Sequence, residues 1–360
     1  MKIKDHPVFR LILLLGLLYL FFISISLMSA SFKFFGKGFA EQLLMTTANP
    51  FVGLLIGILA TSLLQSSSTT TSMTVALVAS QAIELQGAIY IIMGANMGTS
   101  VTNTLVSVAH ISRSGEFKKA FAASTVHDFF NLIAILILFP LQLTTNLLEI
   151  GATFLGNGFQ DLGGLTFANP LKAATKPAVE IIEAISRGSG AIMLMIALVF
   201  LFTSLRYIVK VLKALVIGKV ESFFNETLFK NTLRALIVGL IVTVMVQSSS
   251  ITTSLAVPLA GAGILTLRQI FPFTLGANIG TTITALLASL VTNNVTAVTA
   301  AFAHLLFNIL GIIFVWPVKG VPIFLAESLA NLAIKNKIVP VLYIGIIFFL
   351  LPLTFIILMG

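Results

Sequence analysis

Residues 65–77 read QSSSTTTSMTVAL and residues 247–259 read QSSSITTSLAVPL, so one serine-rich cluster occurs twice, 182 residues apart. The match continues at the same offset, with GANMGTSVT at 94–102 and GANIGTTIT at 276–284. Over the 38 positions that begin at these clusters, 16 residues are identical in the two copies. Shared composition does not explain this agreement, which indicates that the two halves of the chain descend from one unit.

Each serine cluster interrupts an apolar stretch, at 51–83 in the first copy and about 232–265 in the second. One helix through the first stretch would be ~50 Å long, which exceeds the ~30 Å hydrocarbon core of a bilayer. Two arms that meet at QSSS would each be only ~15–20 Å long. A polar tip between short arms predicts a re-entrant hairpin, whose exposed backbone is tolerated only inside protein or beside a wet cavity.

The composition places these hairpins in a membrane. The chain is 58% hydrophobic and 9% charged, with a mean hydropathy of +1.07, unlike any soluble domain of this length. Apolar runs of about 20 residues predict spanning helices, which are expected at 8–32, 88–108, 121–146, 190–205, 270–292, 297–315 and 339–358. Segments of alternating polarity, as a transmembrane barrel requires, do not occur. Because the sequence has no cysteine, it contains neither a disulfide nor a thiolate metal site.

The 21 lysines and arginines predict an orientation. If the first run is an uncleaved span that starts in the cytoplasm, and the first hairpin enters from outside, then 16 basic residues lie inside and five outside, namely Lys33, Lys37, Lys172, Lys176 and Arg187. The positive-inside rule requires such an excess. Counting the first hairpin as a full span would instead place Arg113, Lys118 and Lys119 outside. We therefore predict a multi-pass protein of the cell (plasma or inner) membrane, with a cytoplasmic N-terminus and an extracytoplasmic C-terminus.

The predicted fold is an all-α polytopic membrane protein with two inverted-topology repeats, each with a re-entrant hairpin and a broken transmembrane helix. Its segments are an N-terminal helix in 1–40, repeat 1 in 41–146, an extracellular linker in 147–187, a connecting helix and cytoplasmic linker in 188–222, repeat 2 in 223–318 and a C-terminal transmembrane helix in 319–360. The broken helices are expected at 88–108 and 270–292, and the last helices of the repeats at 121–146 and 297–315. This architecture is typical of transporters.

The hairpin tips carry many hydroxyl groups, those of Ser66, Ser67, Ser68, Thr69, Thr70, Thr71, Ser72, Ser248, Ser249, Ser250, Thr252, Thr253 and Ser254. An isolated serine or threonine in a membrane usually serves close helix packing, but two matching clusters favour binding. At each tip the second arm begins with free N–H groups and a positive dipole end, which suit an anion. Glutamine and serine oxygens suit a hard cation.

Asn96 and Asn278 lie in the repeated motif Gly-Ala-Asn-x-Gly-Thr beside each hairpin. Glycines that flank an amide in mid-span favour local unwinding, which frees carbonyl oxygens for binding. The alternative is that these glycines serve close helix packing. The repetition beside each hairpin favours binding.

Charged residues are rare within the predicted spans. No lysine or arginine lies at mid-span, so an anion bound there would need co-bound cations. Inward flow of those cations could drive uptake, at ~2.3 kcal/mol per net charge per 100 mV. Asp128 is the one acidic residue well inside a span, which makes it a candidate cation ligand or proton carrier. His127 and Asn131 could merely satisfy it, and His127 and its counterpart His304 could serve either packing or ligation.

The order of these motifs resembles the type II sodium/phosphate cotransporters. QSSS with its serine/threonine run, GANMGTSVTNT at 94–104 and FKKAFAASTVHDFFN at 117–131 are similar to that family's first repeat. QSSSITTS, LGANIGTT and the segment 304–308 are similar to the second. The resemblance, over about residues 45–315, implies a non-enzymatic importer of inorganic phosphate that uses Na+ as the coupling ion and no cofactor. It also implies alternating access around a midplane site between the two tips.

Together with the tip chemistry, the resemblance implies individual ligands. Phosphate is expected at Ser66, Ser67, Ser68, Gln247, Ser248, Ser249 and Ser250. Sodium is expected at Gln65, Ser68, Asn96, Thr99, Asp128, Asn131, Gln247, Ser248, Asn278 and Thr281. Asp128 stands where electrogenic members have aspartate and electroneutral members glycine, which implies a third sodium and electrogenic uptake of divalent phosphate. In one departure, the acidic residue expected shortly before Phe117 is not clearly matched, because residues 112–116 read SRSGE.

Other functions are open at this stage. Serine-rich hairpin tips also serve sodium-coupled transporters of organic anions and amino acids, which are the first alternative. An ion channel is the second, although a channel needs no inverted pair of hairpins. The spans contain no metal-ligand cluster or nucleophile–base pair that would suggest an enzyme. The basic residues lie in separate loops rather than on one face, which argues against nucleic-acid binding, and both a monomer and a homodimer are left open.

Overall fold

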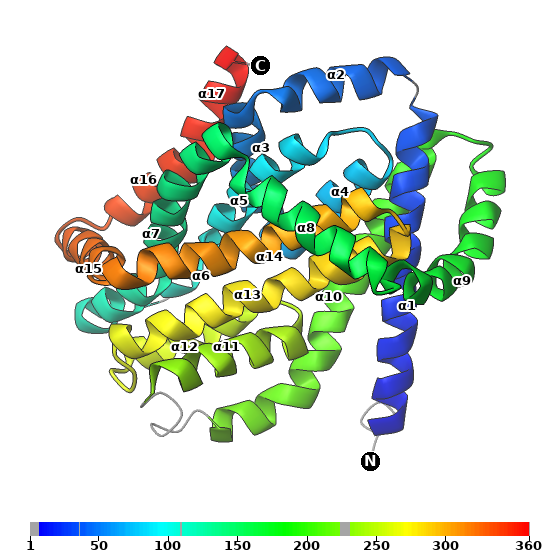
Figure 1. The fold of residues 1–360 in the computed structure, drawn as a ribbon. Coiled ribbons are helices and arrows are strands. Elements are labelled where there is room, and N and C mark those ends of the chain that lie inside the picture. The colour runs from blue at the N-terminus through cyan, green and yellow to red at the C-terminus, as the bar shows by residue number, and fades with distance from the viewer. Residues whose placement is uncertain (1–6, 36, 109, 224–230, 360) are drawn as a thin grey trace.

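The computed structural model describes residues 7–35, 37–108, 110–223 and 231–359, and these form helices and turns with no strand among them (Figure 1). Lys2, Lys4 and Lys230, on which the predicted orientation partly depends, lie outside the described residues. Within that part, six helical segments are long and apolar enough to cross a bilayer: Phe9–Phe34, Ser114–Thr145, Gly190–Val211, Leu267–Thr292, Val295–Val318 and Val339–Met359. The chain is therefore an all-α multi-pass membrane protein, as its sequence predicts.

The first half contains a helical hairpin where the sequence predicts one. Its helices are α1 (Pro7–Phe34), α2 (Lys37–Ala48), α3 (Pro50–Leu64), α4 (Ser67–Ala79), α5 (Leu85–Gly98), α6 (Val101–Val108) and α7 (Ser114–Thr145). The hairpin is α3–α4. The chain bends by 101° before α3, because Pro50 starts that helix and the Asn49 Oδ1 accepts the N–H of Phe51 at 3.1 Å.

The second half contains a matching hairpin, α11–α12. The helices that connect the two halves are α8 (Leu147–Asp161), α9 (Gly164–Ile185) and α10 (Gly190–Phe223). The hairpin itself consists of α11 (Thr232–Val246) and α12 (Ser249–Gly261). The helices that follow it are α13 (Leu267–Thr292), α14 (Val295–Val315), η2 (Trp316–Val318), α15 (Gly320–Lys335), α16 (Val339–Gly345), the π-helical η3 (Ile346–Leu350) and α17 (Leu351–Met359). In Figure 1, α3–α4 lies in the upper part of the molecule and α11–α12 in the lower part.

Each hairpin packs backbone to backbone on the helix that follows it. A Cβ added to Gly94 in α5 would lie 1.9 Å from a carbonyl oxygen of α3, and one at Gly276 in α13 would lie 1.8 Å from a carbonyl oxygen of α11. An added Cβ at Gly98 would lie 2.7 Å from atoms of α3, and one at Gly280 would lie 2.6 Å from an atom of α11. The glycines of the two motifs therefore serve close helix packing, the alternative that the sequence left open.

The prediction of a broken helix at 270–292 is wrong, because α13 is continuous. In the first repeat, the helix does break, between α5 and α6 at Thr99–Ser100. One nearby side chain that differs between the two copies is Asn103 on α6, which donates to Thr253 Oγ1 on α12 at 2.7 Å, a bond to the other hairpin that the matching Ala285 cannot make.

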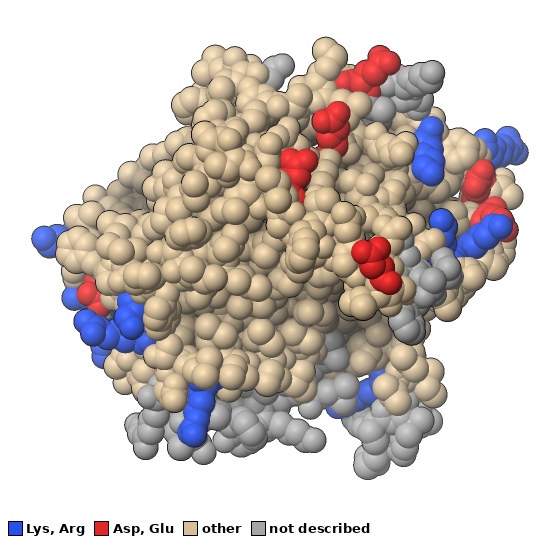
Figure 2. Space-filling model, viewed as in Figure 1, with Lys and Arg blue, Asp and Glu red and all other residues tan. Residues whose placement is uncertain are grey.

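Two further segments contain more helix than the sequence predicts. The expected linker 147–187 forms α8 and α9, and α8 packs on α14 through one face of Leu148, Ala152 and Gly156. The expected single helix in 319–360 is preceded by α15, which packs on α7 and buries small residues at helical spacing, namely Pro322, Ala326, Ala330 and Ala333. Figure 2 shows a broad uncharged surface on the left and centre of one face, with lysine and arginine at its left and lower edges and acidic residues above and to its right.

Candidate functional site

The two hairpin tips have the same local geometry. The backbones of Gln65 and Gln247 adopt the left-handed helical conformation, with φ of 52° and 56°. This conformation is uncommon for non-glycine residues, and residues that adopt it cluster at functional sites. Ser66 and Ser248 follow as N-caps, and each serine Oγ accepts the N–H of the residue three positions on. The second arm of each hairpin therefore starts at the tip, with its first N–H groups free of intrahelical partners.

The next two serines of each tip have free hydroxyl groups. Ser67, Ser68, Ser249 and Ser250 are 4%, 6%, 3% and 7% exposed, so all four lie within the protein. Their hydroxyls hydrogen-bond to no other residue in the part of the chain that the structure describes. Hydroxyl and N–H groups at the start of a helix can together donate to an anion.

The two glutamines differ in their partners. Gln247 Oε1 accepts a hydrogen bond from Thr284 Oγ1 at 2.9 Å, and its Nε2 donates to Val244 O at 2.6 Å. Gln65 is exposed, and the matching hydroxyl of Thr102 is buried without a partner among the described residues. The second tip is thus closed by a glutamine–threonine bond that the first tip lacks.

A buried network joins the two halves through residues of the repeated motifs. His127 Nε2 donates to Asn278 Oδ1, and Asn278 Nδ2 donates to Asn131 Oδ1 at 3.0 Å. His304 Nε2 donates to Asn96 Oδ1 at 3.4 Å. Each of these five side chains is at most 4% exposed. Each histidine therefore hydrogen-bonds to the motif asparagine of the opposite repeat.

Not every predicted ligand is free. The hydroxyls of Thr99 and Thr281 donate to carbonyls of their own helices, at 3.1 and 3.0 Å, although a donating hydroxyl keeps lone pairs that can face a cation. Within the described residues, no hydrogen bond links residues 65–68 to residues 247–250. Hydrogen bonds between the two halves run instead through the histidine–asparagine network, Asn103 and Asn294, and helices of the two halves also pack on one another.

Asp128 is the one carboxylate among the buried side chains of the described residues, and no buried lysine or arginine accompanies it there. Its Oδ2 accepts a hydrogen bond from the Tyr343 hydroxyl at 2.9 Å. Its Oδ1 is buried and accepts no hydrogen bond of normal geometry among the described residues, and the Ser100 hydroxyl lies close to the same carboxylate. A buried carboxylate oxygen with free lone pairs is suited to a hard cation.

Asn103, Thr284 and Tyr343 are candidate functional residues that are not predicted from the sequence. The first two lie within or directly beside the repeated motifs, so the motif itself was the available signal. Asn103 bridges to the second hairpin, donating to Thr253 at 2.7 Å and accepting from Ser254 at 2.9 Å. Tyr343 lies outside both copies of the repeat and gave no signal.

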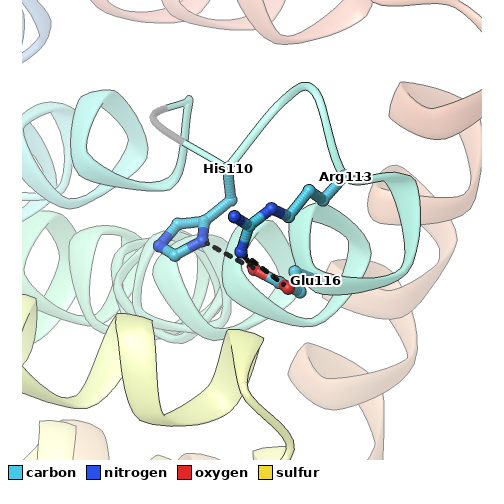
Figure 3. Close-up of polar contacts among 3 residues, drawn as sticks. All are labelled: His110, Arg113 and Glu116. Carbon is cyan, nitrogen blue, oxygen red and sulfur yellow. Dashed lines mark hydrogen bonds and ion pairs between the residues drawn. The ribbon is translucent and has the colours of Figure 1, made fainter.

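The carboxylate that directly precedes Phe117 is engaged near the start of α7 (Figure 3). Glu116 accepts two hydrogen bonds from Arg113 Nη1, at 3.1 and 3.3 Å, and faces His110 Nδ1 at 3.4 Å. The Arg113 side chain is 73% exposed and that of Glu116 36%. Asp128 lies 12 residues along α7, a rise of about 18 Å. Glu116 thus does not supply a second carboxylate beside Asp128.

Comparisons with known proteins agree with these features. A family model described as Na+/Pi-cotransporter matches residues 20–179 and 199–354. Sodium-dependent phosphate transport protein 2B of Homo sapiens is 32% identical over an alignment that covers 96% of this chain and 64% of the human protein. Sodium-dependent phosphate transport protein 2A of Rattus norvegicus is 33% identical, over 94% of this chain and 66% of the rat protein.

The chain thus spans just under two thirds of the length of these relatives. No solved structure matches it. The family match includes both hairpins, both GANxGT motifs and Asp128. The resemblance seen in the sequence is confirmed, and this chain belongs to the Na+/Pi-cotransporter family.

Proposed function

We propose that this chain is a sodium-coupled secondary active transporter that imports inorganic phosphate across the cell membrane. The names of its relatives supply the two solutes. One observation on the chain itself carries the proposal: two tips of equal geometry each present free serine hydroxyls and helix N–H groups inside the protein. Such groups donate to phosphate oxygens.

The proposed phosphate ligands are those that the sequence predicts at the two tips. Because the described interior contains no lysine or arginine, the phosphate charge must be balanced by bound sodium. Among the predicted sodium ligands, Asp128 is the one charged residue, and its Oδ1 is buried. Coupling to sodium is then a condition for binding the anion, as well as the source of driving force.

Sodium and phosphate flux into liposomes tests the function directly. Purified protein should take up radiolabelled phosphate in a saturable manner under an inward sodium gradient, and lose that uptake when potassium replaces sodium. Competition by carboxylates or amino acids, in place of phosphate, would instead identify a transporter of those solutes. Sodium-independent flux without saturation would identify a channel.

We further propose that the two halves are inverted and alternate in opening. The bond between Gln247 and Thr284 and its absence between Gln65 and Thr102 support two states that exchange these bonds. The chain has no native cysteine, so the pair Gln65→Cys with Thr102→Cys can be cross-linked selectively. Because Gln65 is itself a proposed sodium ligand, the readout is the extent of cross-linking rather than uptake. If the first tip also visits a closed state, the two cysteines are expected to cross-link completely with time, although residues 65 and 102 share no hydrogen bond in this structure. Absence of cross-linking would contradict the exchange.

Electrogenic transport is proposed to depend on Asp128. Three sodium ions with divalent phosphate carry one net charge inward, whereas two sodium ions with divalent phosphate carry none. Because Asp128 is the proposed ligand of the third sodium ion, Asp128→Gly is expected to remove the transport current and spare part of the uptake. Voltage-clamped cells that express the variant, with isotope uptake measured in parallel, provide the comparison. An undiminished current would exclude Asp128 from charge coupling.

A further inference from the structure

The C-terminal helix α16 reaches the buried carboxylate of the first repeat. The Tyr343 hydroxyl donates to Asp128 Oδ2 at 2.9 Å. This bond occupies one carboxylate oxygen, while Oδ1 is buried and accepts no hydrogen bond of normal geometry among the described residues. The tyrosine therefore determines which oxygen, and which direction of the carboxylate, is available to a ligand.

Tyr343 is itself held in place by aromatic neighbours. Its ring lies 6.3 Å from that of Phe129, the residue after Asp128, and 5.8 Å edge-on from that of the buried Phe348. Phe348 belongs to the π-helical segment η3, and π-helical turns often occur at functional sites. Through η3 and α17 the same segment packs on the first hairpin arm, α3, and through α16 on α6.

The Asp128–Tyr343 pair has no counterpart in the second repeat. Leu305 follows His304 at the position that matches Asp128. Tyr343 lies after both copies of the repeat, so the duplication did not copy it. Among the residues whose burial the structure describes, Asp128 is therefore the one charged buried site, formed by α7 together with an element outside the repeats.

We infer that Tyr343 is a positioning residue for a transported sodium ion: by holding Asp128 Oδ2, it directs Oδ1 toward the ion. The inference rests on the proposed sodium-coupled transport and adds a residue to it. Tyr343 contacts the carboxylate and not the phosphate site, so its loss should affect sodium far more than phosphate. Its contact with the segment that packs on α3 also connects this site to the first hairpin.

Tyr343→Phe tests the inference in proteoliposomes, because it removes only the hydroxyl. The half-saturating sodium concentration is expected to rise about tenfold, the size expected for one lost hydrogen bond to a charged group. The half-saturating phosphate concentration, measured at saturating sodium, should change by less than about twofold. Tyr90→Phe is the matched control: Tyr90 is a second tyrosine of the membrane domain, 2% exposed, whose hydroxyl bonds to no described residue.

The outcomes separate the inference from the proposed function. If the unmodified protein shows no sodium-dependent phosphate uptake, the function itself is wrong. If the unmodified protein transports and Tyr343→Phe has an unchanged sodium dependence, the positioning role is wrong. A variant that loses sodium and phosphate affinity equally, or that melts at a lower temperature than Tyr90→Phe, would mean a structural role and also overturn the inference.

Discussion

Gly276→Ala is expected to leave little folded protein in the membrane. An added Cβ would lie 1.8 Å from Leu236 O and 2.9 Å from Leu240 N, and both are backbone atoms of α11 that cannot turn aside. The helices α11 and α13 would have to separate, which would also pull Asn278 away from His127, since Asn278 is two residues along α13. The expected loss of folding free energy is at least about 3 kcal/mol, at the upper end for overpacked sites.

Size-exclusion profiles and melting temperatures of detergent-solubilised protein measure this effect. Gly16→Ala is the control, because no atom lies within 4 Å of the added Cβ in α1, and alanine favours a helix over glycine. Gly94→Ala should behave like Gly276→Ala, since its Cβ would lie 1.9 Å from Leu54 O. A sharp profile and unchanged melting temperature for Gly276→Ala would show that the two helices are not in close contact.

The hairpins could be predicted from sequence because the information was local and occurred twice. A polar QSSS cluster within an apolar stretch too long for one span has few solutions in a bilayer. The repetition at 182 residues then made each copy evidence for the other. The repeated motif likewise singles out Asn96 and Asn278, which the structure places in the buried network.

Other features could not be predicted because they depend on pairs of residues far apart in the chain. Asn103 and Thr253 bond across 150 positions, and Tyr343 and Asp128 across 215. The helix break at Thr99–Ser100, which α13 lacks, was likewise not specified by the motif, since both copies carry it. Duplication also hides differences: the matched glutamines have the same backbone conformation but different partners.

Gln247→Ala is expected to reduce sodium-dependent phosphate uptake about 100-fold, while the protein still inserts in the membrane. The side chain closes the second tip by its bond to Thr284, and it is a proposed ligand of both solutes. The substitution would remove about two contacts, one to phosphate and one to sodium. A loss of ~1.5 kcal/mol of binding free energy for each contact corresponds to about 100-fold. Isotope uptake by proteoliposomes with equal protein content measures it.

The backbone conformation of Gln247 must be separated from the role of its side chain. Alanine at a φ of 56° is strained, whereas glycine adopts this conformation freely, so Gln247→Gly removes the side chain without strain. Gln81→Ala is the matched control, because Gln81 is a glutamine with a φ of 65° in the exposed turn after α4. If glycine restores uptake where alanine abolishes it, the turn matters and the amide does not bind. If both variants are inactive and Gln81→Ala is active, the loss belongs to the Gln247 side chain at the tip.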